Sequence, residues 1–91
     1  MLDRINPSAA DRITALALKL LAKRGIDRAV GRDQDLTESG LSSLDMVNLM
    51  LAVEVEFAVK IPDREMTPAN FRTVARIGAL VGALLGRPSG E

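Results

Sequence analysis

The sequence predicts a small all-α protein, a four-helix bundle with three main helices and one short helix. Its 91 residues are enough for one domain, and only 2% of them are aromatic, so the core must be aliphatic. Such a core favours packed helices over a sheet, which uses more aromatic and β-branched residues. Apolar residues also recur at helical spacing in three segments. We expect one domain over residues 1–91, with flexible ends at 1–7 and 87–91.

The first main helix is expected to begin after Pro7. Ser8 is a suitable N-cap, and Asp11 three residues later gives an approximate capping box. Four apolar residues then share one helical face: Ile13, Leu16, Leu20 and Leu21. Gly25 is expected just after the end of the helix, because glycine readily adopts the left-handed backbone found there.

Residues 25–42 form a connection that is longer than most loops in compact domains. Such a segment is either functional or held against the rest of the protein. Four apolar side chains are available to hold it on the bundle: Ile26, Val30, Leu36 and Leu41.

The second main helix is expected over residues 43–57, with Ser42 or Ser43 as its N-cap. Placed at about 100° per residue, one side of this helix carries Met46, Leu49, Met50, Val53 and Phe57. The opposite side carries Leu44, Asn48, Leu51 and Val55. A surface helix normally has one apolar stripe. The first stripe is expected to face the core, and the second either faces a partner or packs under residues 25–42.

Residues 60–63 end this region, since the residue before Pro62 is disfavoured in a helix. Pro68 then allows a short helix, in which it takes a first-turn position. Thr73 is expected to cap the last main helix, which runs to about residue 85 and turns four side chains inward: Val74, Ile77, Val81 and Leu84. Glycines at 78, 82 and 86 repeat every four residues, which predicts close packing of this helix in the bundle.

Composition excludes several classes of function. With no His and no Cys, the chain has no disulfide, no thiolate metal site and no imidazole base. Residues 1–7 lack the apolar segment of a secretion signal, and no run approaches the ~20 apolar residues of a membrane span, so we expect a cytoplasmic protein. Residues 33–59 hold six acidic residues and no basic one, which suggests a basic partner rather than nucleic acid. The acid pairs 33/35 and 54/56 are expected to be solvated charges, with no metal bound.

The run Gly40-Leu41-Ser42-Ser43-Leu44-Asp45 places Ser43 at the start of the second helix. A serine with no base to activate it is a poor nucleophile, so a hydrolase that uses Ser43 is disfavoured. An exposed serine of this kind is better suited to receive a group from another enzyme.

These residues resemble the signature Gly-x-Asp-Ser-Leu-Asp of the acyl carrier proteins. The run Glu54 to Asp63 is similar to that family's Glu-Glu-Glu-Phe…Ile-Pro-Asp segment, and Thr73-Val74 also fits. The resemblance covers residues 36–85 well. It implies that Ser43 takes 4′-phosphopantetheine from coenzyme A, that the arm's thiol holds cargo as a thioester, and that the protein has no catalytic group of its own. It also implies a phosphopantetheinyl transferase, a cargo-loading ligase or synthetase, and downstream enzymes as partners of a monomer.

The chain departs from the family pattern at two places. Ser42 replaces the family's Asp, which leaves Ser42 as a minor alternative attachment site, although the following Leu44-Asp45 selects Ser43. The family's partner-recognition face corresponds to Leu44, Asp45, Asn48, Leu51 and Val55. Fatty-acid carriers place glutamates at the positions of Asn48 and Val55, so we expect a specialised pathway rather than bulk fatty-acid synthesis.

Two matters stay open at this point. The identity of the cargo is open between a fatty acyl group, a polyketide, a modified lipid and an amino acid. The alternative function is a helical protein-interaction module that keeps the fold without the arm, as Ser42 in place of Asp suggests.

Overall fold

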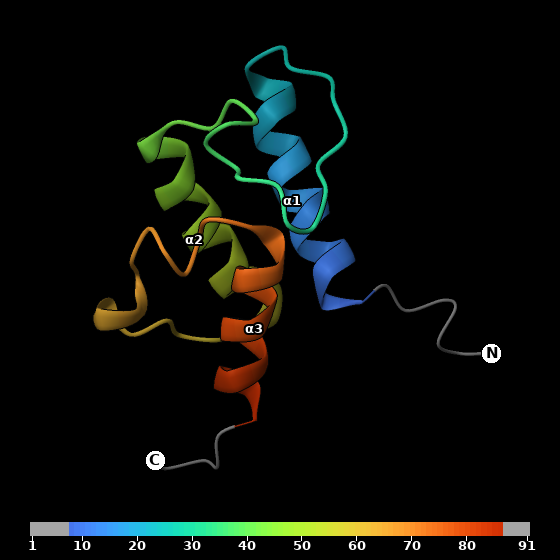
Figure 1. Cartoon of the computed structure of the whole chain (residues 1–91). Coiled ribbons are helices and arrows are strands. Elements are labelled where there is room, and N and C mark those ends of the chain that lie inside the picture. The colour runs from blue at the N-terminus through green and yellow to red at the C-terminus, as the bar shows by residue number, and fades with distance from the viewer. Residues whose placement is uncertain (1–7, 87–91) are drawn as a thin grey trace, which may run out of the picture.

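The computed structural model describes residues 8–86, so the expected flexible ends lie outside it. It contains three α-helices, α1 (Ala9–Lys23), α2 (Ser43–Phe57) and α3 (Val74–Leu85), and a short 3-10 helix, η2 (Asp63–Glu65). Helix α1 packs against both α2 and α3 (Figure 1). Within residues 8–86 there is no strand, so the all-helical prediction is confirmed. None of the helices in this range is long and apolar enough to cross a membrane.

Capping side chains set the helix boundaries as the sequence predicts. The Ser8 hydroxyl accepts a hydrogen bond from the Asp11 N–H at 3.1 Å, and α1 ends before Gly25, whose φ is 76°. The Thr73 hydroxyl accepts from the Arg76 N–H at 3.1 Å at the start of α3. At α2 the cap is Ser42. Each cap satisfies a backbone donor that the first helical turn leaves unpaired.

The expected short helix at Pro68 does not form. Residues 68–71 are turns, and η2 is a single 3-10 turn earlier in the chain. The Asn70 side chain donates to the Glu65 carbonyl at 2.8 Å, while the Asn70 N–H bonds to the Thr67 carbonyl at 3.1 Å. Side chains that bond to nearby backbone groups compete with helix formation, which explains the difference.

The core is aliphatic apart from two phenylalanines, and it combines the inward faces of all three α-helices. Its fully buried members include Ile13, Leu21, Leu49, Val53, Phe71 and Ile77. The expected inward faces are confirmed, although four of their members are only partly buried: Leu16, Leu20, Met50 and Leu84. Leu80 is also buried, at 8% exposure, although the sequence reading did not include it.

The long connection between α1 and α2 is held on the bundle, as its apolar residues predict. Leu36 and Leu41 are buried, while Ile26 and Val30 pack partly against the core. Two backbone hydrogen bonds also tie the connection to the start of α3: Leu36 N–H to the Arg72 carbonyl and Ala75 N–H to the Arg32 carbonyl, each 2.9 Å. The connection is therefore held in place where it approaches the start of α3.

The glycine repeat of α3 does not reflect close helix packing. A Cβ at Gly78 would meet its nearest neighbour, the Ile13 Cδ1, at an ordinary 3.9 Å, and a Cβ at Gly82 would meet nothing within 4 Å. The prediction from spacing was wrong, because spacing alone does not give the distance to the neighbouring helix.

We therefore expect Gly82→Ala to raise the free energy of unfolding by about 0.5–1 kcal/mol, because alanine is the better helix former and meets no obstacle. Urea unfolding followed by circular dichroism would measure this. Gly25→Ala is the contrasting control, since its positive φ should make the same change destabilising by about 1 kcal/mol. A destabilising effect at Gly82 would contradict the open surroundings of this position.

Candidate functional site

The start of α2 is fixed by a reciprocal pair of hydrogen bonds between Ser42 and Asp45. The Asp45 N–H donates to the Ser42 hydroxyl at 3.2 Å, and the Ser42 N–H donates to the Asp45 carboxylate at 2.9 Å. This arrangement is a capping box, in which a short Asp takes the place of the usual Glu or Gln. The direction in which the chain enters the helix is thereby set.

Arg24, the residue after α1, binds the same two side chains. Its Nε pairs with the Asp45 carboxylate, and its Nη2 donates to the Ser42 hydroxyl at 3.0 Å. The Ser42 backbone N–H and then the Arg24 guanidinium hold the pKa of Asp45 below its ordinary value of 3.8. Asp45 is therefore a carboxylate that links the end of α1 to the beginning of α2.

Ser43 is the first residue of α2 and its side chain is exposed. Its neighbour Ser42 is engaged as the cap, so the two adjacent serines have different environments. The sequence contains no imidazole or thiolate to activate the Ser43 hydroxyl. The geometry suits a hydroxyl that an external enzyme reaches, rather than a nucleophile that acts by itself.

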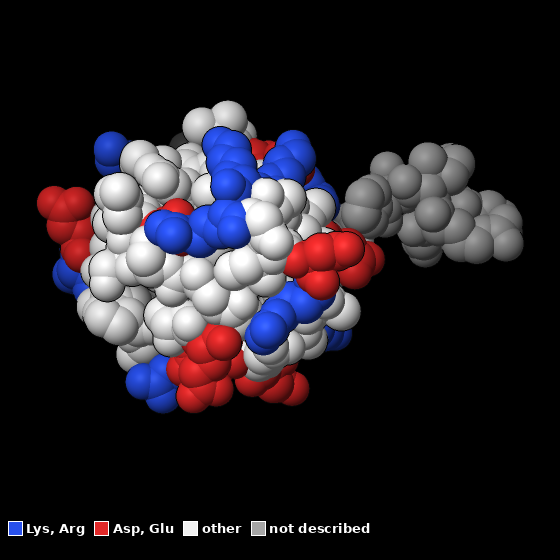
Figure 2. Space-filling view, turned by 90° about the horizontal axis from the view of Figure 1, so that it is seen from above, with Lys and Arg blue, Asp and Glu red and all other residues white. Residues whose placement is uncertain are grey.

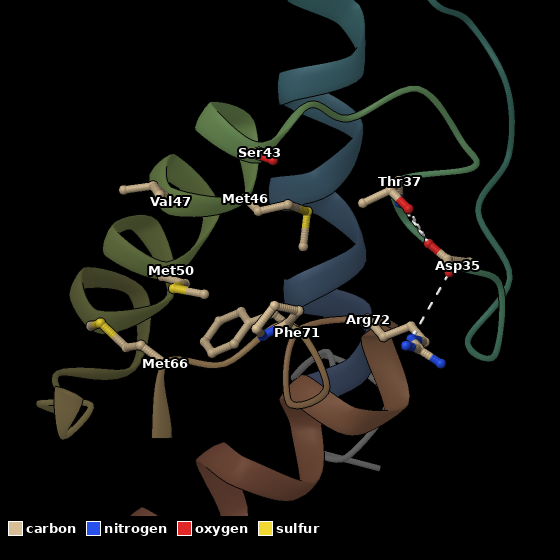
Figure 3. Close-up of a pocket in the computed structure, with 10 residues that line it drawn as sticks. Asp35, Thr37, Ser43, Met46, Val47, Met50, Met66, Phe71 and Arg72 are labelled. Carbon is tan, nitrogen blue, oxygen red and sulfur yellow. Dashed lines mark hydrogen bonds and ion pairs between the residues drawn. The ribbon is translucent and has the colours of Figure 1, made fainter. Parts of the chain in front are cut away.

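Ser43 also lines a groove of about 310 Å³ between α2 and residues 66–72. Figure 3 shows its apolar wall, formed by Met46, Met50 and Phe71, with Met66 close to Met50. Asp35 and Arg72 lie together at the opposite edge, next to Thr37. The sequence reading missed this groove, because it brings together three segments that are far apart in the chain.

The second stripe of α2, which was expected either to face a partner or to pack under residues 25–42, is largely exposed. Leu44, Leu51 and Val55 are 67%, 51% and 83% exposed, and Asn48 is exposed too, so this stripe does not pack under residues 25–42. Val47, at 49% exposure, adds to the apolar area. The sequence reading passed over Val47 because it lies between the two stripes of the helical projection. We call the four exposed apolar residues the α2 stripe: Leu44, Val47, Leu51 and Val55.

Asp45 does not belong to that face. It is only 8% exposed, because its carboxylate turns back toward Ser42 and Arg24. The Asp45 carboxylate is thus engaged within the chain, by a residue 21 positions away in the sequence.

The acidic segment 33–59 is also less available than its sequence suggests. Besides Asp45, three more of its acidic side chains contact groups within the chain. Glu56 Oε2 lies 2.8 Å from Arg12 Nε, and Asp35 Oδ2 lies 4.0 Å from Arg72 Nε. Glu54 Oε2 accepts a hydrogen bond from the Ile61 N–H at 2.7 Å. Figure 2 shows acidic and basic side chains interspersed among uncharged ones when the molecule is seen from above. The described part of the chain has no acidic cluster able to hold a metal ion. Asp35 and Glu54 are partly buried and bonded within the chain, which differs from the expectation of solvated charges, whereas Glu56 is exposed in its ion pair.

A model of the family described as "Phosphopantetheine attachment site" matches residues 11–81. The chain belongs to this family. It is a carrier protein without catalytic groups of its own, and its cofactor is 4′-phosphopantetheine. The exposed serine at the start of α2, beside an open groove, fits a covalently attached arm.

The chain is 38% identical over 80 residues to Aminoacyl carrier protein 1 and to Aminoacyl carrier protein 2 of Bradyrhizobium diazoefficiens. These matches cover 88% of this chain and 89% or 90% of those proteins. Among solved structures, this chain is similar to a chain in the complex of the glycine:[carrier protein] ligase of Bradyrhizobium japonicum with glycylated carrier protein. The two chains superpose with a TM-score of 0.74 and are 36% identical, and the match covers 79% of this chain and 96% of that chain. A complex with the carrier protein from Agrobacterium tumefaciens gives 0.62 at 29% identity, covering 78% and 97%.

The Asp45 contact predicts a defined dependence of stability on pH. Because the pKa of Asp45 is lower in the folded state, its contribution is complete above the unfolded pKa of about 3.9 and is lost as the pH falls through the lower folded value. We expect Asp45→Asn to reduce the free energy of unfolding most at neutral pH, and less as the pH falls below about 4. Urea unfolding of both proteins over this range measures the difference, and a difference independent of pH would contradict the assignment.

Proposed function

We propose that this carrier bears its phosphopantetheine arm on Ser43 and presents an aminoacyl group, bound as a thioester to the thiol of the arm. The choice of Ser43 as the attachment residue is based on the contrast between the two adjacent serines. The Ser42 hydroxyl receives hydrogen bonds from Asp45 N–H and Arg24, whereas Ser43 is exposed at the first position of α2. Modification of Ser42 would remove the cap that begins the helix.

The attachment step follows from ordinary phosphoryl-transfer chemistry. The Ser43 oxygen forms a bond to the phosphorus next to pantetheine in coenzyme A, and the pyrophosphate P–O bond breaks. Adenosine 3′,5′-bisphosphate leaves with that bonding pair, and the hydroxyl proton passes to a base of the transferase. The remaining phosphodiester carries one negative charge, which the positive end of the α2 dipole stabilises.

Two observations support aminoacyl cargo in a specialised pathway. The relatives with 38% identity are named aminoacyl carrier proteins. The α2 stripe is apolar, and the position of Asn48 beside it is neutral, unlike the glutamate-bearing surface of fatty-acid carriers. A partner of this carrier must therefore recognise shape and apolar contact rather than acidic charge alone.

The partners follow from these steps. A phosphopantetheinyl transferase installs the arm, a dedicated ligase loads the amino acid through contact with the α2 stripe, and a downstream enzyme takes the cargo. We propose a monomeric cytoplasmic carrier formed by one domain over residues 1–91, in which η2 and the turns that follow stand in place of a short fourth helix.

The attachment site is tested by intact-protein mass after incubation with coenzyme A and a promiscuous transferase. We expect wild type and Ser42→Ala to gain one phosphopantetheinyl group, and Ser43→Ala to gain none. Ser42→Ala should also lose about 1 kcal/mol of stability, because its cap is gone.

Other outcomes have distinct meanings. A group gained by Ser43→Ala but not by Ser42→Ala would move the attachment to Ser42. Failure of folded wild type with both this transferase and one from the native host would favour a helical interaction module that lacks the arm.

The α2 stripe predicts a local effect on loading. With the glycine:[carrier protein] ligase of Bradyrhizobium japonicum as the first probe, we expect Leu51→Ala to raise the KM for the arm-bearing carrier about 5- to 30-fold, as loss of a central apolar contact would. Leu85→Ala is the matched control, because Leu85 is similarly exposed, at 58%, but lies on α3. Equal KM changes for the two variants would argue against the stripe as the contact surface.

A further inference from the structure

The groove beside Ser43 combines an adaptable apolar wall with one fixed carboxylate. Its wall includes Met46, Met50 and Met66, which are all the methionines of the sequence except Met1. Methionine side chains are flexible and polarizable, so such a wall adjusts to differently shaped apolar groups. Because Ser43 itself lines the groove, an arm attached there begins at the groove's rim.

Asp35 is held in place through one of its two carboxylate oxygens. Its Oδ1 accepts hydrogen bonds from the Thr37 hydroxyl at 2.6 Å and the Thr37 N–H at 2.9 Å, and a longer one from the Glu38 N–H at 3.4 Å. Oδ2 has only the Arg72 Nε at 4.0 Å, which is beyond hydrogen-bond distance. Oδ2 is therefore oriented by the loop and still able to accept a charged donor.

The surrounding charges favour a cation at this oxygen. Asp35 and Arg72 are the charged side chains that line the groove (Figure 3). Arg72 is 65% exposed in its side chain and is therefore free to move away, whereas the Asp35 side chain is only 28% exposed. The Thr37 hydroxyl, followed by the backbone donors, keeps the pKa of Asp35 below its ordinary value of 3.8, so the group is ionised at neutral pH.

We propose that this groove is a resting site for the protein's own aminoacylated arm, in which Asp35 Oδ2 binds the α-ammonium group of the cargo and the methionines contact its apolar part. The proposal rests on the proposed attachment of the arm to Ser43. It assigns Asp35 the selection of a cationic amino acid over a neutral acyl group.

Because the arm is covalently attached, even a weak ion pair with Asp35 is enough to hold the cargo amine in the groove. An exposed ion pair contributes little by itself, but a covalently attached ligand has an effective concentration in the millimolar range. Arg72 competes with the ammonium group for the same carboxylate. Removal of Asp35 and removal of Arg72 should therefore act in opposite directions on the bound cargo.

The test measures the pKa of the cargo amine by NMR. A promiscuous transferase would attach to apo protein a stable glycyl arm, in which nitrogen replaces the thioester sulfur and the glycine carries ¹³C and ¹⁵N. Titration of the glycine ¹³Cα shift gives the amine pKa in wild type, Asp35→Asn and Arg72→Gln. Asn retains an oxygen acceptor for the Thr37 donors, so the loop should keep its shape in the Asp35 variant.

We expect the amine pKa to be about 0.5 lower in Asp35→Asn than in wild type, and higher in Arg72→Gln, since one change removes an attractive charge and the other a repulsive one. Contacts between the glycine Cα protons and the methionine methyl groups should also weaken in Asp35→Asn. An acetyl arm, which lacks the amine, is the matched control and should leave the Thr37 and Glu38 amide shifts unchanged.

An amine pKa that is the same in all three proteins, with no contacts to methionine methyl groups, would overturn the proposal. This result differs from failure of the proposed function, which would appear earlier as the absence of any arm on Ser43. If the acetyl arm perturbed the Thr37 amide as strongly as the glycyl arm, the groove would be an apolar subsite without recognition of the ammonium group.

Discussion

The contact of Arg24 with Asp45 and Ser42 is the constraint on which the site depends. It joins the residue after α1 to the first turn of α2, and it uses the same carboxylate and hydroxyl that cap that helix. Because the capping box and the ion pair share atoms, the entry of the chain into α2 is fixed by local and tertiary contacts together. Because Ser43 directly follows the cap, this arrangement determines its exposed position at the start of α2.

The other end of the same helix pair is tied more loosely. Arg12 bonds to Glu56 and lies 4.3 Å from the centre of the Phe57 ring, but both charged side chains are 37% exposed. Exposed pairs of this kind contribute little stability. On its groove side α2 contributes two methionines, Met46 and Met50, beside Val47. The molecule therefore combines a fixed start of α2, where Ser43 is exposed, with a groove wall that includes flexible methionine side chains.

The sequence predicted the features that are encoded within a few residues. The caps at Ser8, Ser42 and Thr73 and the three α-helices follow from neighbouring residues alone. The role of Asp45 was not predictable, because its partner Arg24 is distant in the sequence and meets it only in the folded bundle. The groove escaped prediction for the same reason, and the short helix because side-chain bonds replaced helical ones. The glycine repeat gave a pattern without the distances needed to interpret it.

The apolar α2 stripe has a consequence for which enzymes of a cell can bind this carrier. Enzymes that capture acidic carriers rely on long-range attraction, which accelerates encounter and is weakened by salt. A carrier whose segment 33–59 is largely paired within the chain, and whose stripe exposes Leu44, Leu51 and Val55, offers those enzymes little attraction. We expect its encounters to be slower and less sensitive to ionic strength than those of acidic carriers, with selection at close contact. If the α2 stripe is the contact surface for a dedicated partner, the same surface also keeps the cargo away from enzymes that serve acidic carriers.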